Sequence, residues 1–176
     1  QYGQVEILTP RKEIVEGDLL ILPGGLDVSP RDYKQVPGFY TGNTDVYKDY
    51  FMHQNLPQYI EMKIPIFGIC LGFQQLCVTF GSQLTQHMYH PTSSPRNELT
   101  HLIRPVVGFD AEKGYLMPAD KKKGFKVNSL HHQGVHQYEL GEDLQPLYLD
   151  EEGWFVEIVK HKTLPIAGVQ FHPEEL

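Results

Sequence analysis

Four short apolar runs along the 176-residue chain have the length and composition of buried strands. Runs of roughly four to eight apolar residues between glycine, proline or charged residues are typical of a sheet that is covered on both faces. The runs are Gln4–Leu8, Asp18–Leu22, Ile64–Ile69 and Ile166–Phe171. A loop with glycine or potentially reactive side chains directly follows each of the last three. Because ligands in open α/β sheets bind beyond the carboxyl ends of the strands, we expect a site where these loops meet.

Helical patterns fill the intervals between these runs. Residues 71–80 place one apolar stripe at i, i+3, i+4 and i+7, and Gly81 follows as a C-terminal stop. The segment from Asp45 to Lys63 also has a helical pattern, but Pro57 interrupts it. Because proline removes a helical hydrogen bond, we expect two helices, with this proline in the first turn of the second. Helices are expected on both faces of a mostly parallel central sheet.

The second half of the chain changes to strands joined by turns. Leu147–Leu149 and Trp154–Val159 flank an acidic turn segment, which predicts a small antiparallel hairpin. Val127–Leu130 is expected to form a further short strand, whereas residues 82–125 give no clear pattern. Since neither a repeat nor a linker interrupts the sequence, we predict a single α/β domain over residues 1–176.

Bulk composition argues against several classes of protein. A hydrophobic fraction of 40% and a charged fraction of 21% are ordinary for a globular domain. No apolar run approaches the ~18 residues of a membrane span, so we expect no membrane association. The formal net charge is −7, and the one cationic run, Lys121–Lys123, is interpreted as a solvated loop. Direct nucleic-acid binding is therefore disfavoured, because it normally depends on a basic surface.

The cysteines and histidines limit the expected cofactors. Two cysteines, Cys70 and Cys77, do not make a disulfide framework, which favours a reducing, cytoplasmic setting. Two close pairs occur among the nine histidines, namely His87 with His90 and His131 with His132. Neither pair has a cysteine or carboxylate at the spacing of a zinc site. We therefore expect no metal and no other cofactor.

Cys70 stands where a strand is expected to turn into a helix, within Gly68-Ile69-Cys70-Leu71-Gly72. A nucleophile elbow has this arrangement, with small residues on both sides of a tight turn. The helix dipole is expected to favour the thiolate, and the Leu71 N–H is available to a developing oxyanion. An isolated cysteine is more often a buried structural residue, but this context favours a catalytic role. Cys77 lies on the apolar stripe and is assigned to the core.

Three motifs of the chain resemble those of class I glutamine amidotransferases. Residues 68–74 resemble their nucleophile motif, residues 168–174 their His-x-Glu motif, and residues 22–25 their oxyanion loop. The motifs occur in the family's order and span most of the chain, so together they are far more specific than any one of them. The resemblance implies an enzyme that hydrolyses a γ-glutamyl amide of a small-molecule substrate.

By this resemblance, Cys70 attacks the γ-carbonyl carbon of glutamine or of a γ-glutamyl amine to form a thioester. His172 takes the thiol proton and later protonates the leaving amine, while Glu174 fixes the imidazole tautomer. The implied oxyanion hole consists of Gly24, Gly25 and Leu71, and the implied substrate pocket of Gln74, Ser129, Leu130 and His131. Direct proton transfer by His131 or His132 is an alternative to a role in the pocket wall.

Further segments resemble one branch of that family, the γ-glutamyl hydrolase-like proteins. They are Gly24–Tyr33, Asp45–Asp49 and Val127–Gln133. The branch often has arginine at the positions of Lys48 and Leu71, and commonly glutamate at that of Met52. These departures leave the predicted triad intact and concern the specificity for the leaving group.

Three functions are compatible with the sequence. Asp27 and Pro30, with residues 31–44, favour a free-standing hydrolase, because aromatic residues such as Tyr33 and Tyr40 could cover a substrate larger than glutamine. The second function is a glutaminase that supplies ammonia to a fused or separate synthase. The third, a catalytically silent binding module on the same fold, is disfavoured by the complete triad.

The two ends of the sequence differ from the pattern of the family. The chain begins with Gln1 and ends soon after Glu174, whereas the resemblance implies further segments on both sides. We therefore expect a domain that is partial at both ends.

Overall fold

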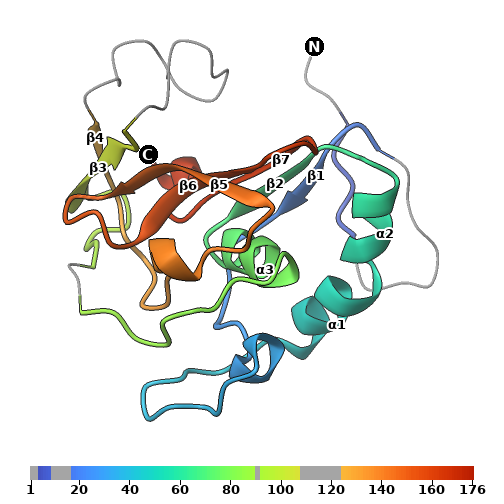
Figure 1. Cartoon of the computed structure of the whole chain (residues 1–176), viewed down its shortest axis with the longest axis horizontal. Coiled ribbons are helices and arrows are strands. Elements are labelled where there is room, and N and C mark those ends of the chain that lie inside the picture. Colours follow the sequence, from blue (N-terminus) through green and yellow to red (C-terminus); the bar gives the residue numbers. More distant parts are fainter. Residues whose placement is uncertain (1–3, 9–16, 90–91, 108–123) are drawn as a thin grey trace.

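One curled seven-stranded sheet organises the part of the chain that the computed structural model describes, which is residues 4–8, 17–89, 92–107 and 124–176 (Figure 1). In spatial order its strands are β1 (Leu20–Leu22), β2 (Ile66–Ile69), β7 (Ile166–Val169), β6 (Val156–His161), β5 (Leu144–Asp150), β3 (His101–Pro105) and β4 (Phe125–Val127). The loop expected at Lys121–Lys123 and the side chain of His90 lie outside the described residues.

Parallel and antiparallel pairing divide this sheet into two parts. β2 pairs in parallel with β1 and with β7, whereas each further pair along the order β7-β6-β5-β3-β4 is antiparallel. The α/β fold is confirmed, but the sheet is mixed and is parallel only over β1, β2 and β7. The parallel register aligns Leu22, Gly68 and Gly168, so three chain segments leave the sheet at the same edge.

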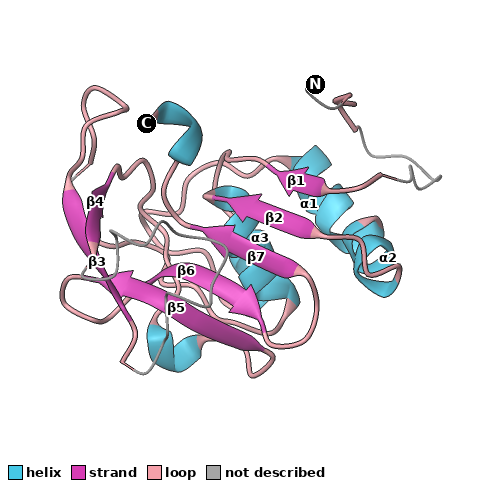
Figure 2. Ribbon diagram, turned by 90° about the horizontal axis from the view of Figure 1, so that it is seen from above, coloured by secondary structure: helices cyan, strands magenta, loops and turns pink. Residues whose placement is uncertain are grey.

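The three α-helices of the described residues lie on one face of the sheet (Figure 2). They are α1 (Val46–Gln54), α2 (Leu56–Glu61) and α3 (Leu71–Thr79). The predicted interruption is confirmed, since α1 ends at Gln54 and Pro57 stands in the first turn of α2. Helices were expected on both faces, but the described connections of the antiparallel pairs β5–β6 and β6–β7 are short turns without a crossover helix that could cover the second face. None of the described helices is long and apolar enough to cross a membrane.

The apolar runs form strands in three of the four predicted positions, as β1, β2 and β7. The exception is residues 4–8, which form no strand and leave Val5 and Ile7 92% and 85% exposed. A strand requires a partner for its backbone groups, and this run pairs with none of the described strands. The predicted hairpin is confirmed as the antiparallel pair β5–β6, although β5 begins earlier than expected, at Leu144.

The strand expected at Val127–Leu130 is wrong over most of its length. β4 ends at Val127. Asn128 lies outside the sheet, where its side chain forms two hydrogen bonds with the backbone of His172.

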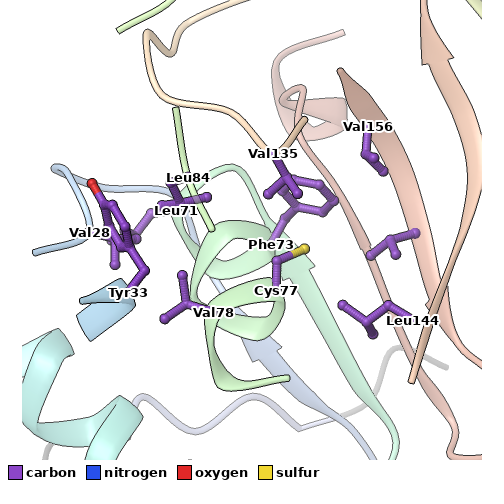
Figure 3. Packing of buried hydrophobic residues seen from close by; sticks show 11 residues of the cluster. Val28, Tyr33, Leu71, Phe73, Cys77, Val78, Leu84, Val135, Leu144 and Val156 are labelled. Carbon is purple, nitrogen blue, oxygen red and sulfur yellow. The ribbon is translucent and has the colours of Figure 1, made fainter. Parts of the chain in front are cut away.

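Helix α3 is the centre of the hydrophobic core, and all of its residues except Thr79 are buried. Figure 3 shows two groups of apolar side chains on either side of this helix. Leu71 and Val78 lie near Val28 and Tyr33, whereas Phe73 and Cys77 lie on the side of β5 and β6. The assignment of Cys77 to the core is confirmed, because its side chain is fully buried.

A methyl group at position 72 is predicted to destabilise the fold. A Cβ atom on Gly72 would lie 2.1 Å from the carbonyl oxygen of Leu22, and a backbone atom cannot rotate away. Gly72→Ala should therefore lower the free energy of unfolding by about 1–3 kcal/mol, as measured by urea denaturation. Gly17→Ala is the control, since nothing lies within 4 Å of its Cβ position. Equal stability of the two variants would contradict the prediction.

Candidate active site

Cys70 occupies a strained turn between β2 and α3. Its backbone has φ 50° and ψ −104°, which is unfavourable for any residue with a side chain. The turn is possible because the neighbouring glycines let the two elements approach, as a Cβ on Gly68 would lie 2.6 Å from the carbonyl carbon of Gly72. The Cys70 N–H donates to the carbonyl oxygen of Val169 at 2.9 Å, which fixes the turn to β7. The predicted nucleophile elbow is present in the structure.

The Cys70 thiol is buried, and this burial controls its protonation. Only 4% of the residue is exposed, and desolvation raises the pKa of the thiol to about 12. A hydrogen bond from the Leu71 backbone lowers this pKa, and the charges of Glu174 and Glu157 raise it further. The Leu71 backbone at the start of α3 favours the thiolate, but desolvation outweighs this effect and the net shift of the pKa is upward. The sulfur therefore needs a nearby base before it can act as a nucleophile.

His172 and Glu174 form a pair just beyond the end of β7. The imidazole Nδ1 lies 2.7 Å from Glu174 Oε1, and since an ionised carboxylate only accepts hydrogen bonds, Nδ1 carries the proton. The short 3₁₀ helix Pro173–Glu175 brings the carboxylate back towards the ring. His172 is buried, and its second nitrogen, Nε2, is the one that can accept a proton. Because β7 is the neighbour of β2, this pair lies at the same sheet edge as Cys70.

Asn128 holds the backbone of this histidine from both sides. The His172 N–H donates to Asn128 Oδ1, and Asn128 Nδ2 donates to the His172 carbonyl oxygen, each at 2.8 Å. Both groups are buried, so this bidentate contact fixes the residue that carries the imidazole. Sequence reasoning did not assign a role to Asn128. Its only signals were its position within the predicted strand Val127–Leu130 and within the segment Val127–Gln133, which resembles the γ-glutamyl hydrolase-like branch.

The Gly24–Gly25 turn lies directly against the histidine. A Cβ on Gly24 would be 2.5 Å from His172 Cε1, so only glycine fits at this position. Gly25 is exposed, and its N–H donates to no backbone acceptor among the described residues. The Leu71 backbone lies close enough to the Cys70 sulfur to lower the pKa of the thiol. The assignment of these three residues to an oxyanion hole stays a prediction.

Three of the four residues assigned to the substrate pocket are held by hydrogen bonds to protein partners. Gln74 is buried, and its Nε2 donates to Gln133 O at 3.0 Å and to Gln170 Oε1 at 3.1 Å. Ser129 is also buried, and its N–H donates to Ser93 Oγ. The last two are Leu130, which is half-buried, and His131, whose Nδ1 lies 2.9 Å from Gln133 O. Their contact with a substrate stays a prediction.

The other histidine considered as a base, His132, is engaged elsewhere. Its Nε2 lies 2.9 Å from Asp27 Oδ1 and its Nδ1 lies 3.2 Å from His87 Nδ1. These contacts connect the loop after β1 to the loops around residues 87 and 132. In the described part of the chain, no group of three or more His, Cys, Asp or Glu side chains could hold a metal ion.

Comparisons with known proteins agree with this fold. A family model described as peptidase C26 matches residues 9–174. YvdE of Lactococcus lactis subsp. lactis, named a glutamine amidotransferase-like protein, is 34% identical over 167 residues, which cover 89% of this chain and 66% of that protein. The carbamoyl phosphate synthase small chain of Metallosphaera sedula is 26% identical over 133 residues, which cover 76% of this chain and 30% of that protein.

A solved structure has the same fold. It is a glutamine amidotransferase from Thermotoga maritima, with a TM-score of 0.61 at 18% identity over 93% of this chain and 61% of that one. The chain belongs to the peptidase C26 family of class I glutamine amidotransferase-like proteins, and the family implies an enzyme of the cysteine hydrolase type. The chain spans 66% of the length of YvdE and 30% of the length of the carbamoyl phosphate synthase small chain.

Removal of the Asn128 side chain is predicted to impair catalysis as well as stability. Asn128→Ala leaves the buried N–H and carbonyl of His172 without partners, which should cost about 1–3 kcal/mol of unfolding free energy. Displacement of the imidazole should also lower kcat by roughly 100-fold for any reaction in which His172 transfers a proton. The exposed Asn97→Ala serves as the control. If Asn128→Ala loses stability but keeps full turnover, Asn128 does not position His172.

Proposed function

We propose that this chain hydrolyses γ-glutamyl amides with Cys70 as nucleophile, His172 as general base and acid, and Glu174 as the group that orients the imidazole. The observation that carries the proposal is the position of the Cys70 elbow at the end of β2, at the same sheet edge as the hydrogen-bonded His172–Glu174 pair that follows the neighbouring strand β7. A nucleophile, a base and an orienting acid at one sheet edge are the parts of a catalytic triad.

The reaction proceeds in two steps. Cys70 Sγ attacks the γ-carbonyl carbon while its proton passes to His172 Nε2, and the carbonyl oxygen becomes an oxyanion. The N–H groups of Gly25 and Leu71 stabilise this charge. The carbon–nitrogen bond then breaks, and His172 gives its proton to the leaving amine, so a γ-glutamyl thioester remains on the sulfur. His172 next activates a water molecule, which releases glutamate and restores the thiol.

The high pKa of the buried thiol fits this sequence of events. At neutral pH the sulfur stays protonated in the free enzyme, so proton transfer to His172 must accompany the attack. Both cysteines are free, as a thiol nucleophile requires, and this supports the proposed cytoplasmic location.

Aromatic residues near the Asp27–His132 contact favour an amine larger than ammonia as the leaving group. Tyr40 is 53% exposed and stacks on His87, with the ring centroids 4.3 Å apart. Both residues, together with Phe39, line a cavity of about 380 Å³. Such exposed ring faces can cover an amine chain or attract its charge. Tyr33, in contrast, is buried in the core, so the expectation that it covers the substrate is not supported.

Ammonia supply to a synthase is the second candidate function. It is favoured by the similarity to a carbamoyl phosphate synthase small chain. A glutaminase of this kind would have a synthase domain or subunit as its partner, and the hydrolysis of glutamine would depend on that partner.

The nucleophile can be identified by comparing the two cysteines. Cys70→Ala should lower the hydrolysis of glutamine and of γ-glutamyl amines by several orders of magnitude. Cys77→Ala should keep most of the activity, because this side chain lies in the core. A glutamine-mimicking electrophile should label the wild-type protein and Cys77→Ala, but not Cys70→Ala. An unlabelled and inactive wild-type protein would instead indicate a silent binding module.

The leaving group can be tested at Tyr40. Tyr40→Ala should reduce the preference in kcat/KM for γ-glutamyl amines over glutamine by roughly 3- to 10-fold, because it removes one aromatic contact to the amine. Tyr138→Ala is a matched control, since Tyr138 is exposed and its ring pairs with another histidine, His136. If the protein cleaves glutamine only when a synthase is added, the ammonia-supplying function is correct.

A further inference from the structure

Lys48 makes an unusual contact with the loop assigned to the oxyanion hole. Its side chain extends from the first turn of α1 and Nζ donates a hydrogen bond to the carbonyl oxygen of Gly24. A Cβ on Gly25 would lie 2.6 Å from this Nζ and 2.7 Å from Leu71 Cδ2. The ammonium group, the Gly24–Gly25 peptide and Leu71 are therefore in direct contact next to the nucleophile elbow.

The planarity of the peptide determines what this contact does. In a trans peptide the carbonyl and the N–H of the same amide point in opposite directions. The ammonium group that holds the Gly24 carbonyl therefore also fixes the direction of the Gly25 N–H, which points away from Lys48. Gly25 is exposed, and among the described residues this N–H donates to no backbone acceptor. It is a donor that is directed by the protein and available to a ligand.

The sequence places this lysine where a helix does not favour it. Asp45 caps α1 by accepting hydrogen bonds from the N–H groups of Tyr47 and Lys48, so the cation lies in the first turn. The positive end of the helix dipole repels a cation there. None of the ion pairs among the described residues includes Lys48. The contact with Gly24 thus accounts for a charge that neither the helix nor an ion pair stabilises.

We infer that Lys48 is a positioning residue of the oxyanion hole, which orients the Gly25 N–H through the Gly24 carbonyl. This inference rests on the proposed amidase function. A cation on the carbonyl also polarises the amide and makes its N–H a stronger donor. That gain is largest when the substrate oxygen carries a full negative charge, which occurs in the transition state and not in the bound substrate. Loss of this polarisation should therefore lower kcat and leave KM nearly unchanged.

A direct role in substrate binding would give a different kinetic result. If the ammonium group instead paired with a carboxylate of the glutamyl substrate, its loss would weaken the ground-state complex and raise KM. A purely structural role in packing α1 would lower the thermal stability and reduce kcat only in proportion to the unfolded fraction. The ratio of the effects on kcat and KM separates these roles from the positioning role.

The test uses γ-glutamyl para-nitroanilide as substrate for the wild-type protein and four variants. Lys48→Met should lower kcat by roughly 10- to 100-fold with little change in KM, and Lys48→Arg should restore most of kcat, because the guanidinium can hold the same carbonyl. Lys162→Met is the matched control, since Lys162 Nζ also donates to a backbone carbonyl, that of Glu142, on an exposed part of the surface. Its kcat should match the wild type. Cys70→Ala gives the background rate.

Each outcome separates this inference from the proposed function. A wild-type rate in Lys48→Met, or a rise in KM at constant kcat, overturns the positioning role while activity that depends on Cys70 still supports the amidase. A loss of kcat in Lys48→Met that Lys48→Arg does not restore also overturns it. Hydrolysis by the wild type that equals the Cys70→Ala background overturns both. Thermal melting of each variant verifies that kcat refers to folded protein.

Discussion

The close approach of α3 to the parallel strands is the constraint on which the rest of the site depends. At Gly72 the helix comes so near to β1 that a single methyl group would meet the Leu22 carbonyl oxygen at 2.1 Å. Because the helix begins this close to the sheet, the chain must reverse within one residue, and that residue is Cys70, with φ 50°. A backbone conformation of this kind costs about 1–3 kcal/mol, and the packing of the nearly fully buried α3 maintains it.

Burial of the Cys70 thiol has an electrostatic consequence, because desolvation raises the pKa of the sulfur. A thiol with a pKa of about 12 is inert at neutral pH unless a base is present at the correct position. His172 is held in its place by three independent contacts: the Glu174 carboxylate on the ring, the Asn128 amide on the backbone, and the close packing of Gly24. The same buried environment strengthens every hydrogen bond that acts on the transition state.

The parts of the fold that could be predicted from the sequence are those with a local cause. The apolar stripe of 71–80, the interruption near Pro57 and the turn between β5 and β6 each depend on neighbouring residues, and all three agree with the structure. Residues 4–8 have an equally apolar pattern but form no strand, since a strand exists only where another backbone pairs with it. The antiparallel part of the sheet was predicted only as a small hairpin for the same reason. The direction of strand pairing is a property of chain segments that are distant in sequence.

The candidate active site also combines features with a local cause and features that depend on residues distant in sequence. The sequence by itself determined the elbow and the neighbouring His172–Glu174 pair, because glycine spacing and a separation of two residues are local geometry. Only the tertiary structure decided that the Cys70 thiol is desolvated, that Asn128 holds the histidine, and that Lys48 reaches the Gly24 carbonyl. Asn128 and Lys48 contact partners 44 and 24 positions away in the chain. No local pattern encodes such contacts. They form only when the fold brings the loop after β4 to the end of β7, and the first turn of α1 to the loop after β1.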